Sequence, residues 1–228
     1  MVAMKVLENL GWILTCTSGF AVLIIFSAMA ADVGLSNIFC WHPILLSMAF
    51  LLYMNEGLLV YFNNNNKTDR AVSRYWHGRY MLLATLFSIG GYIAIYISHA
   101  RHNHSQFGIG HAFINALHVW IGYLVLLLML LQSFVGMSKY FGFAKAKWHG
   151  KLGVYIYFGG ILNICIAAIF WNSESWRGIV RFIVILTALS LALITLWIKR
   201  NGGILLSNDD EIDQENEYET VSLNDSTL

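Results

Sequence analysis

Six long apolar stretches constrain the fold of this chain of 228 residues more than any other feature. They cover roughly residues 10–30, 41–62, 77–98, 113–137, 150–171 and 178–198. Each is about 20 residues or longer, which lets a helix cross a hydrocarbon core of ~30 Å. Lipid offers no partners for open backbone groups, so such segments must be helical. The sequence therefore predicts an all-α integral membrane protein with six transmembrane helices.

The composition agrees with this interpretation and excludes several classes. Hydrophobic residues make up 57% of the chain and charged residues only 12%, whereas soluble domains average about 25% charged residues. A nucleic-acid binder would need a dense basic face, which the sequence lacks. Eight of the 13 acidic residues follow Ser207. We therefore expect a membrane domain over 1–200 and a disordered acidic cytosolic tail over 201–228.

The distribution of lysine and arginine predicts the orientation. One side would hold the N-terminus, the 63–79 and 138–151 loops and the C-terminus with 11 basic residues, and the other side would hold three. Those three are Arg101, Arg177 and Arg181. The positive-inside rule then places both termini in the cytosol. We expect a multi-pass protein of an endomembrane vesicle or of the plasma membrane.

Two features have a simple interpretation beside a functional one. Three cysteines, Cys16, Cys40 and Cys165, lack the spacing of a metal site, and we read them as small hydrophobic residues. The first apolar segment, with Ala28-Met29-Ala30, resembles a signal peptide with a cleavage site. Its apolar run is long for a signal peptide, so we favour a transmembrane helix.

Four histidines stand at ordered places in this pattern. His42 opens the second segment, His77 opens the third, His118 lies in the first turns of the fourth, and His149 opens the fifth. Alternate helices start on opposite faces of the membrane, so His42 and His118 share one depth and His77 and His149 share the other. Ionisable residues at such positions are costly in a membrane and indicate function.

Facing imidazoles in a helical bundle are the ligands of a six-coordinate haem. Two pairs at opposite faces predict a four-helix core, made of the second to fifth helices, that holds two haems and conducts electrons. The simpler alternative is interfacial histidines that bond backbone or lipid groups. A second alternative is an ion or proton transporter without haem, although the one carboxylate in these segments, Glu56, belongs at the face opposite His42.

Glycines four residues after two of the histidines, Gly122 and Gly153, share a helix face with them. They would leave room for a flat macrocycle, or would serve close helix packing. Glu56 is either a hydrogen-bonded structural residue beside Asn55 or a proton partner near the cytosolic haem.

At this point the chain resembles the cytochrome b561 family over roughly residues 10–200, and most of all its short six-helix members. The resemblance rests on motifs in the second to fifth segments. They are Cys40-Trp41-His42-Pro43 with Glu56-Gly57-Leu58-Leu59-Val60-Tyr61, Arg74 before His77, Leu117-His118-Val119-Trp120-Ile121-Gly122, and Trp148-His149 with Gly153. A departure is Phe113, which stands where the family often has a histidine; His111 lies two residues earlier.

The resemblance implies two b haems, one ligated by His42 with His118 and one by His77 with His149. It implies an oxidoreductase that carries electrons from cytosolic ascorbate to a non-cytosolic acceptor, either monodehydroascorbate or ferric ion, and it suggests a homodimer. A structural or signalling membrane protein that has kept the fold without turnover is a further alternative.

Charged residues near each expected pair suggest where substrates would bind. Ascorbate is a monoanion, and cations flank the inner pair: Arg74, Arg79, Lys145, Lys147 and Lys151. These cations are equally explained as determinants of topology. On the outer side, a histidine-rich loop could capture a metal ion or be a solvated loop: it holds His99, Arg101, His102, His104 and His111. We single out His111, His104 and Arg101 for the outer acceptor.

Overall fold

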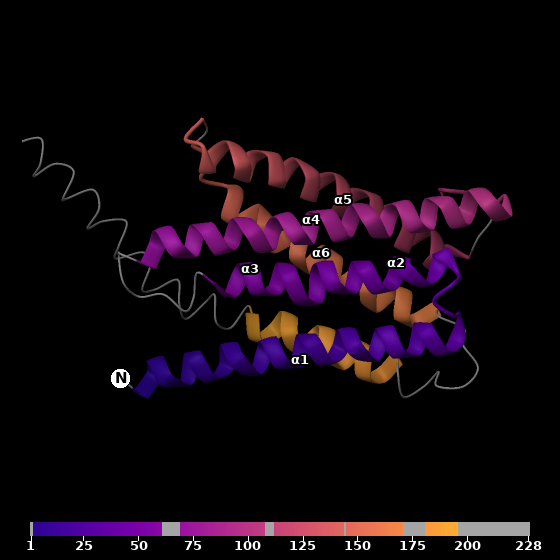
Figure 1. Cartoon of the computed structure of the whole chain (residues 1–228), viewed down its shortest axis with the longest axis horizontal. Helices are drawn as coiled ribbons and strands as arrows, with labels where there is room; N and C mark the ends of the chain where they lie inside the picture. Colours follow the sequence, from indigo (N-terminus) through magenta and orange to yellow (C-terminus); the bar gives the residue numbers. More distant parts are fainter. Residues whose placement is uncertain (1, 61–68, 108–111, 144, 171–180, 196–228) are drawn as a thin grey trace, which may run out of the picture.

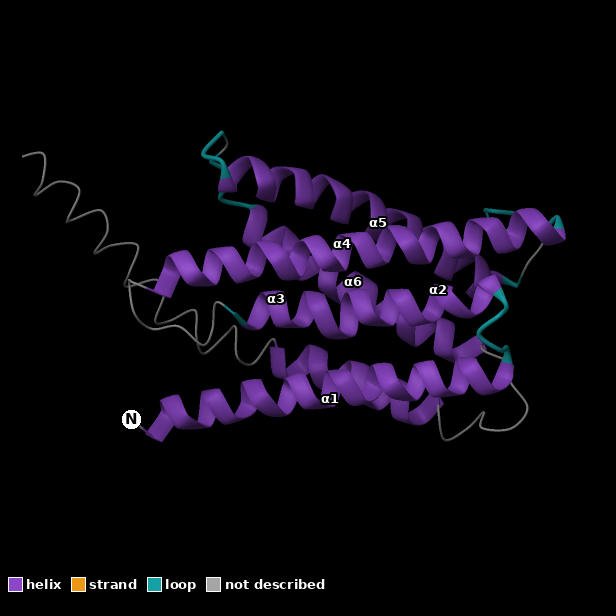
Figure 2. Cartoon of the chain, viewed as in Figure 1, coloured by secondary structure: helices purple, strands orange, loops and turns teal. Residues whose placement is uncertain are grey.

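The computed structural model describes residues 2–60, 69–107, 112–143, 145–170 and 181–195, and this part of the chain is helical apart from its turns (Figure 2). The elements are α1 (Val2–Asp32), α2 (Ile38–Ser47), η1 (Met48–Met54), α3 (Asn55–Leu59), α4 (Asp69–His102), α5 (Phe113–Tyr140) and α6 (His149–Phe170). A further apolar helix covers Arg181–Thr195. The tail over 201–228 and His111 lie outside the described residues.

Left-handed residues end three of these helices. Gly34, with φ of +82°, and Gly142, with φ of +78°, follow α1 and α5. Asn103, with φ of 54°, follows α4. Glycine and asparagine tolerate this conformation, which caps a helix and turns the chain. The start of α2 is capped by the Asn37 side chain, which accepts a bond from the Phe39 N–H at 3.0 Å.

The helices lie side by side along the long axis of the molecule, with α4 between α5 and the α2–η1–α3 segment (Figure 1). Within the described residues, five helices are long and apolar enough to cross a membrane: Ile13–Asp32, Ile38–Leu59, Ala71–His102, Phe113–Tyr140 and His149–Ile169. Five of the six expected segments are thus found as long spans, but α4 begins at Asp69, two turns before His77, rather than at His77. The described part of the sixth segment is the shorter helix Arg181–Thr195, and the residues on either side of it, 171–180 and 196–228, lie outside the described residues.

The second span contains a π-helix, η1, between two α-helical parts. A π-helical turn accommodates one extra residue without changing the faces that the flanking turns present. The apolar pattern of the second segment does not predict this element.

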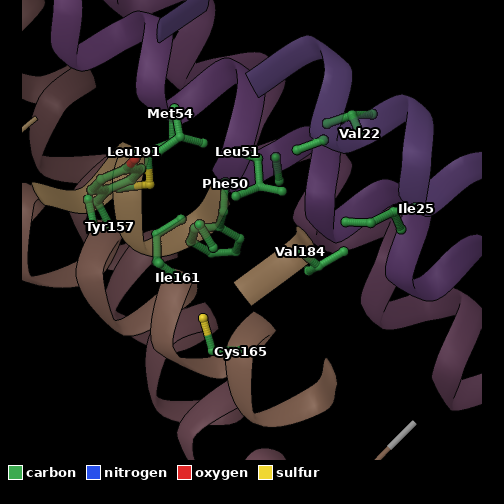
Figure 3. Packing of buried hydrophobic residues seen from close by; sticks show 14 of the residues in the cluster. Val22, Ile25, Phe50, Leu51, Met54, Tyr157, Ile161, Cys165, Val184 and Leu191 are labelled. Atoms are coloured by element: carbon green, nitrogen blue, oxygen red, sulfur yellow. The ribbon is translucent and has the colours of Figure 1, made fainter. Parts of the chain in front are cut away.

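The core forms where η1 meets α6, α1 and the last helix. Phe50 and Met54 of η1 point towards Ile161 and Tyr157 of α6 (Figure 3). Phe50 lies directly against Gly160, where a Cβ atom would collide with its ring. Large apolar side chains remain exposed on the outer faces, including Leu23, Leu127 and Phe134. An apolar exterior of this kind suits lipid contact, and together with the five long spans it describes a multi-pass membrane protein.

Candidate functional site: two facing histidine pairs

The four histidines form two facing pairs. His42 of α2 and His118 of α5 have ring centroids 6.3 Å apart, with their planes at 89°. His77 of α4 and His149, the first residue of α6, have centroids 6.3 Å apart, with planes at 79°. The structure thus brings together the same histidines that the alternating topology pairs.

The two pairs lie at opposite ends of the bundle. The clearest measure is α4, where His77 belongs to one pair and Gly91 bonds to His42 of the other. These two residues are 14 positions apart, which is about 21 Å along an α-helix. A membrane core is ~30 Å thick, so one pair lies towards each face.

Three of the four rings are held by a backbone carbonyl at Nδ1. His42 donates to the Gly91 oxygen at 2.9 Å, His77 to the Gly57 oxygen at 2.8 Å, and His118 to the Asn163 oxygen at 3.2 Å. A carbonyl partner requires the proton on Nδ1 and leaves Nε2 as a lone-pair donor. These rings therefore carry the tautomer that a metal ligand at Nε2 needs.

The fourth ring is held in a different way. Gly136 of α5 faces the His149 ring so closely that an added Cβ would lie 3.0 Å from its Cε1 atom. One turn earlier on the same face, the Gln132 side-chain N–H donates to the His149 backbone oxygen. Among the described residues, His149 Nδ1 is buried without a hydrogen-bond partner.

The spacing of each pair suits a six-coordinate haem iron. Two metal–imidazole bonds of about 2 Å, with about 1 Å from each nitrogen to its ring centre, place the centres about 6 Å apart. Both observed separations are 6.3 Å. The donor set, two neutral imidazoles, is that of a low-spin b haem with no open position. The residues present thus fit the group.

Comparison with known proteins places this geometry in a family. The sequence profile described as eukaryotic cytochrome b561 matches residues 41–172, more than half of the chain and all four histidines. The chain belongs to the cytochrome b561 family. Membership implies a haem cofactor and agrees with the resemblance noted from the motifs.

Curated relatives are more distant. The transmembrane reductase CYB561D2 of Mus musculus is 31% identical over 144 residues, 61% of this chain and 61% of the relative. The lysosomal membrane ascorbate-dependent ferrireductase CYB561A3 of Mus musculus is 27% identical over 140 residues, 60% of this chain and 55% of the relative. The plasma membrane ascorbate-dependent reductase CYBRD1 of Xenopus laevis is 28% identical over 103 residues, 45% of this chain and 34% of the relative. The matched part thus spans between a third and three fifths of these relatives.

In this cytochrome b561-family chain, the expected inner cations are not all alike. Arg74, Lys145, Lys147 and Lys151 are exposed. Arg79 is two residues after His77, about 200° around the helix, and its guanidinium lies over the Tyr75 ring at 4.3 Å from the centroid. It therefore occupies an aromatic site on the outer side of α4 rather than the face that carries His77.

Three outer histidines lie near one another, but His99 and His102 belong to the end of α4 and not to the expected loop. The His104 ring lies 6.0 Å from that of His99 and 6.1 Å from that of His102. Arg101 and His104 are exposed, and His111 lies outside the described residues. Within the described residues, no group of three or more histidine, cysteine, aspartate or glutamate side chains is arranged to hold a metal ion.

Glu56 and Asn55 make different contacts. Glu56 accepts a hydrogen bond from Thr15 of α1 at 2.5 Å, which agrees with the structural interpretation of this carboxylate. Asn55 is fully buried, and its Oδ1 accepts bonds from Tyr157 and Thr195, each at 3.2 Å. These contacts tie α3 to α1, α6 and the last helix.

Gly122 and Gly153 face amide side chains of the opposite helix. A Cβ at Gly122 would lie 3.1 Å from Asn163 Nδ2, and one at Gly153 would lie 3.3 Å from Gln132 Nε2. The helix-packing alternative therefore describes what these glycines do within the chain. The macrocycle interpretation of the same residues stays a prediction.

Several residues of the site were missed by sequence reasoning. The carbonyls of Gly57 and Gly91 and the residues Gln132, Gly136 and Asn163 all contact a histidine of a pair. A signal was present, because each lies 14 or 15 residues after a histidine, or one turn beyond that. Antiparallel neighbours bring such positions beside the ligand of the partner helix.

Proposed function

We propose that this protein transfers single electrons across a membrane, from cytosolic ascorbate through two b haems to a non-cytosolic acceptor. The proposal rests chiefly on the two facing histidine pairs, at 6.3 Å each and at opposite ends of one bundle. His77 with His149 would hold the inner haem, and His42 with His118 the outer one. A bis-imidazole haem supplies a reversible one-electron iron couple with no site for oxygen.

The chain's own residues would set the properties of each centre. The carbonyls of Gly57, Gly91 and Asn163 fix the tautomer and plane of three rings and raise the basicity of the metal-binding nitrogen. Buried side chains between the two ends, such as Leu51, Ile156 and Tyr157, keep water from the middle of the bundle. No acid–base dyad or nucleophile is required, because only electrons cross.

Ascorbate would bind at the end that carries His77 and His149. Arg74 lies three residues before His77 and therefore shares its face, and Lys147 lies beside the start of α6. Lys139 adds a cation there, since it lies three residues after Gly136 and its ammonium group donates to the Ala146 oxygen at 3.2 Å. Converging positive charge would raise the local concentration of the ascorbate anion. Lys145 and Lys151 would contribute at longer range.

The acceptor would meet the opposite end, where Arg101 at the end of α4 and His104 just after it are exposed. Relatives are described as ascorbate-dependent reductases, and one as a ferrireductase. Ferric ion or monodehydroascorbate are accordingly the acceptors we propose. The orientation with both termini in the cytosol and a homodimeric state belong to the same proposal, as does a location in a plasma or endomembrane.

A visible spectrum of the purified protein tests the proposal first. We expect two haems per chain and a b-type α-band that grows when ascorbate is added. Protein loaded with haem but not reduced by ascorbate would contradict the donor and favour a non-catalytic membrane protein. Protein that folds without any haem would contradict the electron path and leave ion transport as the alternative for the four histidines.

A further inference from the structure

We call the group that accepts the Nδ1 hydrogen bond of a paired histidine its brace. The braces lie at a common spacing along their helices. On α4, Gly91 lies 14 residues after His77 and bonds His42. On α6, Asn163 lies 14 residues after His149 and bonds His118. In each case the helix that carries one ligand also carries, near its other end, the brace for the ligand of its antiparallel neighbour.

The second span obeys the same register once η1 is counted. Gly57 lies 15 residues after His42 rather than 14, and it bonds His77. The π-helical turn of η1 lies between them and absorbs the extra residue. Three ligands are thus braced by the residue in the same structural position, and each brace is a backbone carbonyl.

The position that remains is Gln132, which lies 14 residues after His118 on α5. It lies against His149 as the register requires, because its side-chain N–H donates to the His149 backbone oxygen. Yet Gln132 Oε1 and His149 Nδ1 are both buried and, among the described residues, both without a partner. A buried acceptor and a buried donor at one site would destabilise the fold if both stayed unpaired.

We propose that Gln132 is the positioning residue of His149, its carboxamide oxygen accepting a hydrogen bond from the Nδ1–H group directly or through one water molecule. The inference rests on the proposed function, since it assigns the brace of the inner haem. Of the four ligands, His149 of the inner centre would then be the one held by a movable side chain, whereas His77 is held by a backbone carbonyl. Gly136, one turn further along the same face, has no side chain and so lets the ring lie against α5.

Substitutions at Gln132 test this role through haem potentials. Gln132→Met removes the acceptor while keeping an unbranched side chain of similar length. A weaker brace makes Nε2 less basic and stabilises ferric iron less, so the inner haem should become easier to reduce. Gln132→Glu keeps an oxygen acceptor and adds charge, so the inner haem should become harder to reduce. We expect about a tenfold change in the reduction equilibrium for each, in opposite directions, which is ~59 mV for one electron.

A matched control is Ser133→Ala, the next residue on α5, whose hydroxyl bonds Thr85 at 2.7 Å. Both haem potentials should be unchanged in this variant. A purely structural role of Gln132 would move both substitutions in the same direction. Shifts of equal sign, or unchanged inner potentials in protein that holds two haems, would overturn the proposal for Gln132 alone. Wild-type protein without haem would instead overturn the proposed function.

A second measurement does not depend on how the Gln132 variants fold. In His149→Gly, added imidazole can replace the missing ligand, whereas 1-methylimidazole has no second N–H to donate. With Gln132 present, we expect imidazole to restore the low-spin inner haem spectrum at concentrations at least tenfold lower than 1-methylimidazole does. Equal restoration by the two compounds would overturn the proposal.

Discussion

At the scale of residues, the absence of a side chain at Gly136 decides where the His149 ring can lie. A Cβ there would lie 3.0 Å from Cε1 of His149 and 3.7 Å from its Nε2. The ring has little room to retreat, because it faces His77 across the pair. Gly136→Ala should therefore displace the ligand and lower inner haem affinity by at least about tenfold, as for other losses of ligand support.

Haem titration of the apoprotein measures this effect. Gly150→Ala is the matched control, because a Cβ at Gly150 meets nothing within 4 Å although the residue is next to His149. It should bind both haems as the wild type does. Equal haem binding by Gly136→Ala and Gly150→Ala would show that the close approach does not matter.

Asn55 is a second residue with structural weight, because its contacts join α3 to α6 and to the last helix. Its Oδ1 receives two hydroxyl groups, from Tyr157 and Thr195, at a site without exposure to solvent. Asn55→Leu would remove the acceptor that both hydroxyls share, at a cost of about 1–3 kcal/mol. Thr195→Val removes one donor and leaves the Tyr157 bond, so its cost should be smaller, about 0.5–1.5 kcal/mol.

Thermal unfolding in detergent, followed by circular dichroism, orders these variants. We expect the wild type to be most stable, then Thr195→Val, then Asn55→Leu. Identical melting curves for the two variants would contradict the shared acceptor, because only Asn55→Leu loses both bonds.

At the scale of elements, η1 sets the register between His42 and Gly57 on the second span, and this can be tested. It places Gly57 under His77 although the spacing from His42 is one residue longer than on the other helices. Deleting Leu52 should convert η1 to α-helix and keep both haems, with reduced stability. Deleting Leu86, an exposed residue in the middle of α4, should rotate Gly91 by about 100° relative to His77 and lose one haem.

Haem content of the two deletion proteins, purified at equal yield, is the measurement. We predict that the Leu52 deletion keeps more haem than the Leu86 deletion. A deletion in a regular α-helix rotates one end relative to the other, whereas η1 has an extra residue to lose. Loss of haem to the same extent in both would mean that η1 is a local irregularity without a role in the register.

The elements also show which features of the site can be predicted from the sequence. The pairing of His42 with His118 and of His77 with His149 follows from alternating topology alone, so it was predictable. The carbonyl braces and Gln132 depend on which atoms face one another across helices, which periodicity does not encode. The π-helix was missed because its residues, Met48–Met54, are as apolar as an α-helical span.

For the whole molecule, the distance between the two histidine pairs decides whether both centres are needed for electron transfer across the bundle. Electron tunnelling falls steeply with distance, and the bundle separates its two ends by about 21 Å along α4. Neither centre alone could therefore connect both faces at a useful rate. His118→Ala should lose the outer haem and keep the inner one, because the inner ligands and their braces lie at the other end.

Proteoliposomes separate these two consequences. In vesicles that contain His118→Ala, ascorbate on the side of the inner pair should still reduce the remaining haem, while a ferric chelate on the opposite side should be reduced at least about tenfold more slowly than with wild-type protein. His118→Ala with exogenous imidazole is the matched restoration, since a free ligand can occupy the vacated position. Undiminished transmembrane reduction in His118→Ala would mean that electrons leave by a route that does not include the outer pair, and unchanged haem content would mean that His118 is not a ligand.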